Sequence, residues 1–127
     1  ESAGPMTLLI IDDDPDACYL FKTILEKEGY RVLTATDARR GLRLVKEKSP
    51  EIVFLDIKMP RVNGIEILRR AKKIKKDLIV IMLTGYATLD TARKAMELGA
   101  YDYVTKPFDL EAIKASIRDA LEVNASD

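Results

Sequence analysis

The feature that most constrains the fold is a regular alternation of short apolar runs with longer amphipathic segments. The runs have the length of strands, and the segments between them repeat apolar residues at helical spacing. Strands and helices that alternate in this way form βα units around a parallel sheet. The first run, Leu8 to Ile11, has no polar alternation, as expected when helices cover both faces of the sheet. The chain therefore predicts an α/β fold.

Five such βα pairs can be counted along the chain. The predicted strands cover residues 8–11, 30–35, 52–55, 78–83 and 101–104. The predicted helices run from Pro15 to Gly29, from about Asp37 to Ser49, from Gly64 past Ala71, through Ala92 and Met96 to Gly99, and from Asp109 past Leu121. With right-handed crossovers, five parallel strands favour a doubly wound, flavodoxin-like sheet of order 2-1-3-4-5 over a closed barrel, which needs eight strands.

One domain accounts for the 127 residues. Residues 1–5 lack the pattern of a signal peptide and are interpreted as a cloning remnant before Met6. Residues 6–123 form the predicted domain, and residues 124–127 are expected to fray. The longest apolar run is far shorter than the ~20 residues that cross a bilayer, so we expect a cytoplasmic protein without a membrane partner.

Composition excludes several classes of function. The chain has no His, which excludes Ser-His-Asp catalysis, His-ligated zinc and phosphohistidine chemistry on this chain itself. The 21 basic and 21 acidic residues balance, so no strongly basic field predicts direct nucleic-acid binding. The single Cys18 excludes an internal disulfide.

Polar residues follow the predicted strands, at the edge where a doubly wound sheet binds its ligands. They are Asp12, Asp13 and Asp14 after the first strand, Asp56 after the third, Thr84 after the fourth and Lys106 after the fifth. Taken alone, each has an ordinary explanation: Asp14 is a helix cap, a lone Thr ends a strand and a lone Lys is solvated. Taken together, they indicate a site.

The carboxylates require compensation, because two of them about 4 Å apart repel by ~4 kcal/mol at an effective dielectric near 20. Either one acid is protonated, or a divalent cation lies among the oxygens. Mg²⁺ suits one or two carboxylates with water and a phosphoryl oxygen. A hydroxyl and an ammonium at the same edge add donors for anionic oxygens, which predicts phosphoryl transfer.

Four motifs resemble those of the receiver domains of two-component response regulators. They are Ile11-Asp12-Asp13, the run from Leu55 to Pro60 that leads to Asn63-Gly64, the run from Leu83 to Tyr86, and the run from Tyr103 to Phe108. The resemblance covers residues 6–121, and residues 84–109 are most similar to receivers of the nitrogen-regulation type. Such receivers commonly precede an ATPase and a DNA-binding domain.

The resemblance implies that Asp56 is the phosphoacceptor, which takes a phosphoryl group from the phosphohistidine of a histidine kinase. It implies that Asp13 and Asp56 bind Mg²⁺ directly, with the backbone carbonyl of Lys58 as a third ligand and Asp12 acting through water. Self-phosphorylation and autodephosphorylation would be the only chemistry, so the chain is expected to be a signalling protein, not an enzyme.

The resemblance also implies a switch. Lys106 and Thr84 would contact phosphoryl oxygens, with the small Gly85 leaving access for the group, while the aromatic ring of Tyr103 turns inward. The face formed by the fourth helix, fifth strand and fifth helix would then act on an output domain or protein, or on a second copy of the chain. Lys58 and Tyr86 occupy positions that, in the family, influence access of water to the acyl phosphate.

Two alternatives stay open. Asp12-x-Asp14, Thr84 and Lys106 are also similar to an aspartate-nucleophile phosphatase, in which Asp12 would be the nucleophile, although the chain has no insertion for a substrate cap. A non-phosphorylated interaction module is the other alternative. A flavin carrier is weaker, because three acids at the first strand end would repel a phosphate.

A basic cluster lies outside these motifs. It consists of Arg69, Arg70, Lys72, Lys73, Lys75 and Lys76. The simplest interpretation is a solvated helix face, and the alternative is a docking patch.

Overall fold

The computed structural model describes residues 6–56, 58–59, 62–84, 89–105 and 109–126. Within these ranges the side chains of residues 58–59, 62–63, 84, 89–91, 105 and 123–126 are not described.

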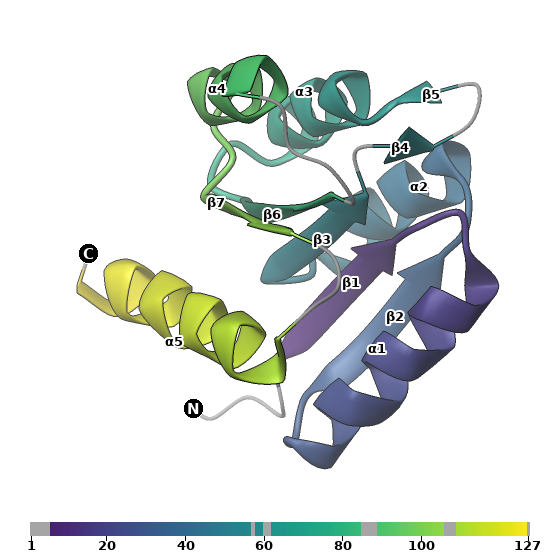
Figure 1. Cartoon of the computed structure of the whole chain (residues 1–127), viewed down its shortest axis with the longest axis vertical. Coiled ribbons are helices and arrows are strands. Elements are labelled where there is room, and N and C mark those ends of the chain that lie inside the picture. The colour runs from purple at the N-terminus through teal and green to yellow at the C-terminus, as the bar shows by residue number, and fades with distance from the viewer. Residues whose placement is uncertain (1–5, 57, 60–61, 85–88, 106–108, 127) are drawn as a thin grey trace.

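A five-stranded parallel sheet forms the centre of the molecule (Figure 1). Its strands are β1 (Thr7–Ile11), β2 (Arg31–Ala35), β3 (Ile52–Asp56), β6 (Ile79–Thr84) and β7 (Asp102–Thr105). The spatial order is β2-β1-β3-β6-β7, which confirms the predicted order 2-1-3-4-5. The strand β1 pairs with a neighbour on each side, so Leu9 lies between Leu33 of β2 and Val53 of β3.

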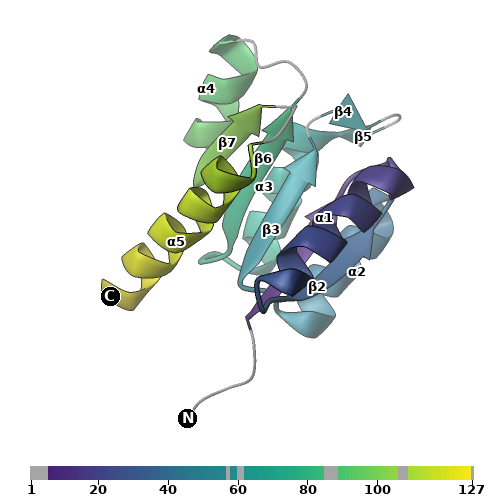
Figure 2. The ribbon, with the colours of Figure 1, turned by 60° about the horizontal axis from the view of Figure 1, so that its bottom comes forward.

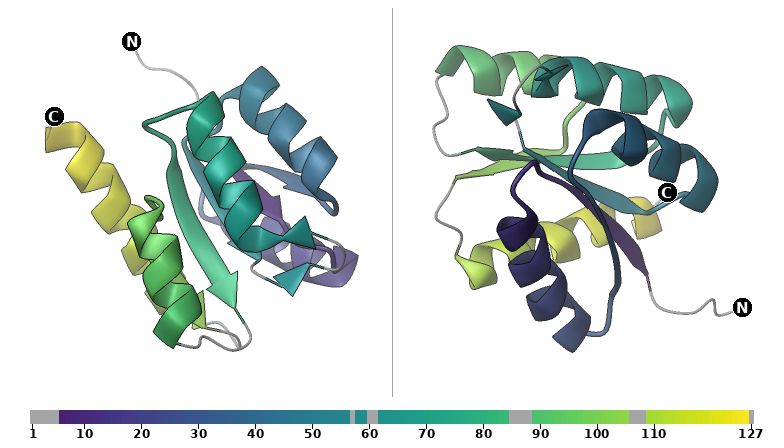
Figure 3. Two further views of the ribbon diagram at one scale, coloured as in Figure 1. Left: turned by 90° about the horizontal axis from the view of Figure 1, so that it is seen from above. Right: turned by 90° about the vertical axis from the view of Figure 1, so that its right-hand side faces the viewer.

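In the part of the chain that the structure describes, five helices cover the sheet in two outer layers (Figure 3). They are α1 (Pro15–Lys27), α2 (Ala38–Lys48), α3 (Gly64–Ile74), α4 (Leu89–Glu97) and α5 (Leu110–Ser126). Figure 2 shows α1 and α5 on one face, and α2, α3 and α4 pack on the other. Because the five strands of this sheet are all parallel, each connecting helix runs antiparallel to them. The helices therefore begin at the carboxyl edge of the sheet.

Aspartate side chains cap the starts of three of the helices. Asp14 Oδ1 accepts a hydrogen bond from the N–H of Asp16 at 3.0 Å, and Asp37 Oδ1 accepts one from Arg40 at 2.8 Å. Asp109 plays the same role at the start of α5. These side chains satisfy backbone N–H groups that have no partner within their helix.

Two apolar cores form, one on each face of the sheet, because alternate strand residues point to opposite faces. The core under α1 and α5 includes Phe54, which is fully buried and lies 5.3 Å from the ring of Phe21. The core under α2, α3 and α4 includes Ile11, Leu55 and Leu68. The residues that precede the polar strand ends are therefore held from both sides.

A small hairpin stands where the sequence predicts only a loop through Pro60. It pairs β4 (Lys58–Met59) with β5 (Val62–Asn63) in antiparallel fashion (Figure 1). Two-residue strands are too short to show a period of two in the sequence, so no pattern could predict them.

Gly41 weakens the prediction of α2, because glycine destabilises the interior of a helix. In the structure α2 nevertheless continues through Gly41. A Cβ atom at this position would lie 2.6 Å from Ile11 Cδ1. The missing side chain therefore lets α2 approach the last residue of β1.

The last helix, α5, extends to Ser126. The fraying expected from Asn124 onward stays a prediction. Among the described residues, no helix combines the length and apolar character needed to span a bilayer.

Candidate metal and phosphoacceptor site

The sheet register brings three acids together. Ile11 of β1 pairs with Leu55 of β3, so the next residues, Asp12 and Asp56, emerge side by side at the carboxyl edge. Asp13 follows directly. One carboxylate oxygen from each of these three acids lies within 4.8 Å of the others. We call Asp12, Asp13 and Asp56 the acidic cluster.

Burial distinguishes the members of the acidic cluster. The exposed fractions of Asp12 and Asp56 are only 1% and 4%, whereas Asp13 is more exposed. Asp12 is fixed by the backbone, because its N–H donates to the carbonyl of Ala35 at 3.1 Å and its Oδ1 accepts from the N–H of Asp14 at 3.0 Å. Carboxylates whose oxygens lie this close together repel one another, so the cluster favours a positively charged ligand.

Cys18 lies directly behind the cluster and was not among the predicted site residues. Its side chain is 4% exposed, and its Sγ lies 3.4 Å from the backbone oxygen of Asp12, to which the thiol donates. Burial, followed by the negative charge of Asp12, raises the pKa of the Cys18 thiol to about 11. No sequence pattern predicts this contact, because it depends on how α1 packs against β1.

The donor set fits a hard divalent cation. Mg²⁺ binds oxygen ligands at about 2.1 Å in an octahedral shell, so two ligand oxygens lie roughly 3–4 Å apart. Carboxylate oxygens within 4.8 Å of one another come close to this spacing, and small side-chain rotations or a bridging water can complete it. The acidic cluster can therefore hold Mg²⁺.

Asp14 does not belong to the cluster. Its side chain caps α1 through the N–H of Asp16, as the sequence predicts. The run of three acids after β1 thus divides into two that face Asp56 and one that starts the helix.

The remaining predicted residues are described in part. β6 ends at Thr84, so its backbone lies at the carboxyl edge, opposite Thr105 of β7. Lys58 lies in β4. Their side chains, and all of Gly85, Tyr86 and Lys106, lie outside the described residues. Tyr103 lies on the edge strand β7, and 40% of it is exposed.

Curated relatives of two lengths match the chain. Sporulation initiation phosphotransferase F of Bacillus subtilis is 35% identical over 119 residues, which cover 94% of this chain and 96% of that protein. Nitrogen assimilation regulatory protein NtrX of Azorhizobium caulinodans is 38% identical over 117 residues, which cover 91% of this chain but 26% of that protein. The chain thus spans about a quarter of the longer regulators, and its likeness to them is consistent with the nitrogen-regulation type.

Solved structures share the fold. A response regulator receiver domain protein of Clostridium thermocellum is 38% identical and superposes with a TM-score of 0.89, covering 94% of this chain and 97% of that one. A response regulator protein of Burkholderia pseudomallei, with a phosphorylated aspartic acid, calcium ion and citrate, is 30% identical with a TM-score of 0.84; the match covers 95% of this chain and 72% of that one.

The family model described as the response regulator receiver domain matches residues 8–118, which include all three members of the acidic cluster. The strand order, the acids at the strand ends and the relatives agree with that match. The chain therefore belongs to the response regulator receiver domain family.

Proposed function

We propose that Asp56 accepts a phosphoryl group from the phosphohistidine of a histidine kinase, with Mg²⁺ held by the acidic cluster. The convergence of Asp12, Asp13 and Asp56 within 4.8 Å carries this proposal. The similar protein of Burkholderia pseudomallei, which has a phosphorylated aspartic acid and a calcium ion, supports it.

In the proposed reaction, a carboxylate oxygen of Asp56 attacks phosphorus. A new O–P bond forms as the N–P bond of the donor breaks, and the histidine nitrogen leaves with its electron pair. Bound Mg²⁺ would neutralise part of the charge that the carboxylates and the phosphoryl group share. Burial of Asp56 at a strand end fixes the attacking oxygen, which favours the reaction through positioning.

Other residues complete the proposed site. Asp13 and Asp56 would hold the metal directly together with the carbonyl of Lys58, and Asp12 would act through water. Thr84 and Lys106 would contact phosphoryl oxygens. The chain itself would carry out only self-phosphorylation from small donors and autodephosphorylation.

The proposed output is a movement of Tyr103. Tyr103 lies on an edge strand with 40% of its surface exposed, so its ring is not locked in the core and would turn inward when Thr84 is drawn toward the phosphoryl group. Met96 of α4 is also exposed, at 44%. The face of α4, β7 and α5 would transmit the change to an output domain or protein in the cytoplasm, or to a second copy of the chain.

The experiment is labelling with acetyl phosphate or phosphoramidate, with and without Mg²⁺, followed by intact mass. The wild-type chain should gain one phosphoryl group only with Mg²⁺, and Asp56→Asn should gain none. Asp14→Asn is the matched control, because that acid only caps α1, and it should label like the wild type.

Other outcomes would redirect the proposal. Labelling that survives in Asp56→Asn and is lost in Asp12→Asn would favour the aspartate-nucleophile phosphatase. A chain that gains no mass from any donor would be an interaction module that is not phosphorylated.

A further inference from the structure

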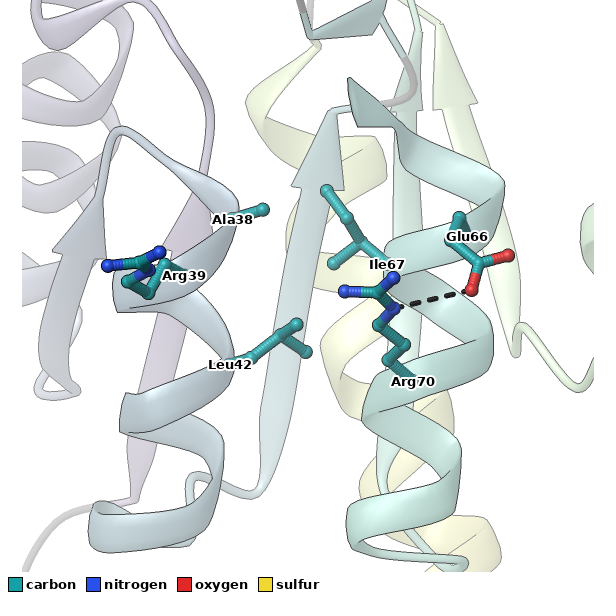
Figure 4. A pocket seen from close by; sticks show the side chains of 6 residues that line it. All are labelled: Ala38, Arg39, Leu42, Glu66, Ile67 and Arg70. Atoms are coloured by element: carbon teal, nitrogen blue, oxygen red, sulfur yellow. Dashed lines mark hydrogen bonds and ion pairs between the residues drawn. The ribbon is translucent and has the colours of Figure 1, made fainter. Parts of the chain in front are cut away.

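The helices α2 and α3 lie side by side on one face of the sheet, and a hollow opens between them (Figure 4). Its volume is about 380 Å³. It is lined by Ala38, Arg39 and Leu42 from α2 and by Glu66, Ile67 and Arg70 from α3. In Figure 4 the side chains of Leu42 and Ile67 extend into the space between the two helices, the guanidinium of Arg70 lies beside Ile67, and Arg39 lies on the side of α2 away from α3.

A second hollow lies farther along the same pair of helices. Its volume is about 440 Å³, and Val45, Lys46 and Ser49 face Ile74 and Lys75 across it. Ile74 is 43% exposed, so the apolar core leaves much of it uncovered. This hollow again combines an apolar centre with cations at its margins.

The two hollows are related by a shift of seven residues. Ala38 and Arg39 in the first correspond to Val45 and Lys46 in the second, and Ile67 corresponds to Ile74. Leu42 corresponds to Ser49, a polar residue just past the end of α2, so the apolar side chains of the second hollow are Val45 and Ile74. Seven residues are two turns of helix, or about 10 Å along the axis. The α2–α3 groove, defined by the residues that line both hollows, therefore offers two similar subsites about 10 Å apart.

Charge is concentrated around this groove. Residues 38–48 and 64–77 contain 11 of the 21 basic residues but only three of the 21 acidic ones. Their net charge is +8, and the rest of the chain carries −8. Arg69 and Arg70 both pair with Glu66, at 2.9 and 3.3 Å, whereas Arg39 and Lys46 have no ion pair among the described residues. The groove thus presents excess positive charge to solvent.

We propose that the α2–α3 groove binds an acidic amphipathic helix of a partner protein, with one apolar side chain in each hollow. A helix places residues i and i+7 on one face, which matches the repeat of the groove. Acidic residues beside these anchors would meet Arg39 and Lys46. The proposal is independent of phosphorylation at Asp56.

The groove chemistry favours a protein helix over nucleic acid. Leu42, Ile67 and Ile74 place apolar side chains between the cations, and phosphates gain nothing from contact with such side chains. Glu66 lies in the first hollow, and its carboxylate would repel a phosphate backbone.

Fluorescence anisotropy with a labelled peptide tests the proposal. The probe is a helix-forming peptide of about 18 residues, made of Glu and Ala, with two Leu residues seven positions apart. A second peptide of the same composition has its leucines nine positions apart, which puts them on opposite sides of the helix. We expect the first peptide to bind at least tenfold more tightly.

Matched variants locate the binding. Ile74→Asp should weaken binding about tenfold, whereas Met96→Asp, a control of almost equal exposure (44% against 43%), should leave it unchanged. Arg39→Glu combined with Lys46→Glu should weaken binding and reduce its dependence on salt. The control for charge is Arg93→Glu combined with Arg118→Glu, two exposed positions on α4 and α5.

Equal affinity for the two peptides would overturn the proposal. Unchanged peptide binding by Ile74→Asp would also overturn it, and urea denaturation would show that this variant is folded like the wild type. A DNA duplex that binds more tightly than the first peptide, through Arg39 and Lys46, would make the groove a nucleic-acid site instead.

Discussion

The acidic cluster and the α2–α3 groove concentrate opposite charges in one small domain, and they hold those charges differently. The acids of the cluster emerge from strand ends, and Asp12 and Asp56 are almost fully buried. Arg39 and Lys46 of the groove extend from helix surfaces into solvent. The sheet register fixes the positions of the acids, whereas helical spacing fixes those of the cations.

This difference matches the size of ligand that each region suits. A buried, rigid set of oxygens can enclose a single small ion, because its ligands are positioned before binding. Exposed side chains spread over two helices can contact a partner only over an extended surface. Four predictions test the comparison.

The largest expected effect concerns the support beneath each region. Phe54 is fully buried on the strand that carries Asp56, so Phe54→Ala should lower the free energy of unfolding by about 3–5 kcal/mol. Ile74→Ala, in the groove, should cost about 1 kcal/mol or less, because that side chain is 43% exposed. Urea denaturation of both variants gives the two values. Equal losses would contradict the view that the cluster is built on the core and the groove on the surface.

The second prediction concerns the thiol behind the cluster. With the pKa of Cys18 raised from 9.0 to about 11, the thiolate fraction at pH 8.5 should be roughly 100-fold lower in the folded chain than in urea. Alkylation by iodoacetamide, followed by intact mass, should therefore be slower by at least that factor. The rate in the folded chain should continue to rise with pH up to about 11. A rate that levels off near pH 9 would show that the thiol does not sense the cluster or its own burial.

The third prediction joins the two regions. Gly41→Ala adds a methyl group 2.6 Å from Ile11 Cδ1, and Ile11 precedes Asp12. The overpacking should lower the free energy of unfolding by about 1–3 kcal/mol, whereas replacing glycine by alanine inside a helix raises it by roughly 1 kcal/mol. The variant should therefore be less stable than the wild type. Ile11→Val removes the crowded Cδ1 atom and should recover part of the loss. A double-mutant cycle by urea denaturation measures this coupling, and additive effects would count against the contact.

The smallest expected effect tests repulsion within the cluster. Asp13→Asn removes one negative charge, so without Mg²⁺ the melting temperature should rise by about 2–4 °C. The same variant should gain less than the wild type when Mg²⁺ is added, because one ligand is weakened. Asp109→Asn, at the helix cap of α5, controls for the general effect of removing a carboxylate. Unchanged melting in both conditions would contradict the cluster.

The strand order and the meeting of Asp12, Asp13 and Asp56 could be predicted from the sequence, because parallel strands bring their carboxyl ends to one edge. The β4–β5 hairpin could not, since its strands are too short to show a period. Why a glycine stands inside α2 at position 41 could not be predicted either, because the explanation depends on the distance between α2 and β1. The side chains of Thr84 and Lys106 lie outside the described residues, so their roles stay predictions.

The helix directions described above have a further electrostatic consequence. Each helix begins at the carboxyl edge, so the positive poles of the backbone dipoles gather near the acidic cluster. The negative poles lie at the other edge, where Lys27, Lys48, Lys73 and Lys94 occupy last turns of α1 to α4. This built-in polarisation helps three carboxylates to coexist before any ion arrives. It also opposes the arriving ion, so the cluster should release Mg²⁺ more readily than its formal charge suggests.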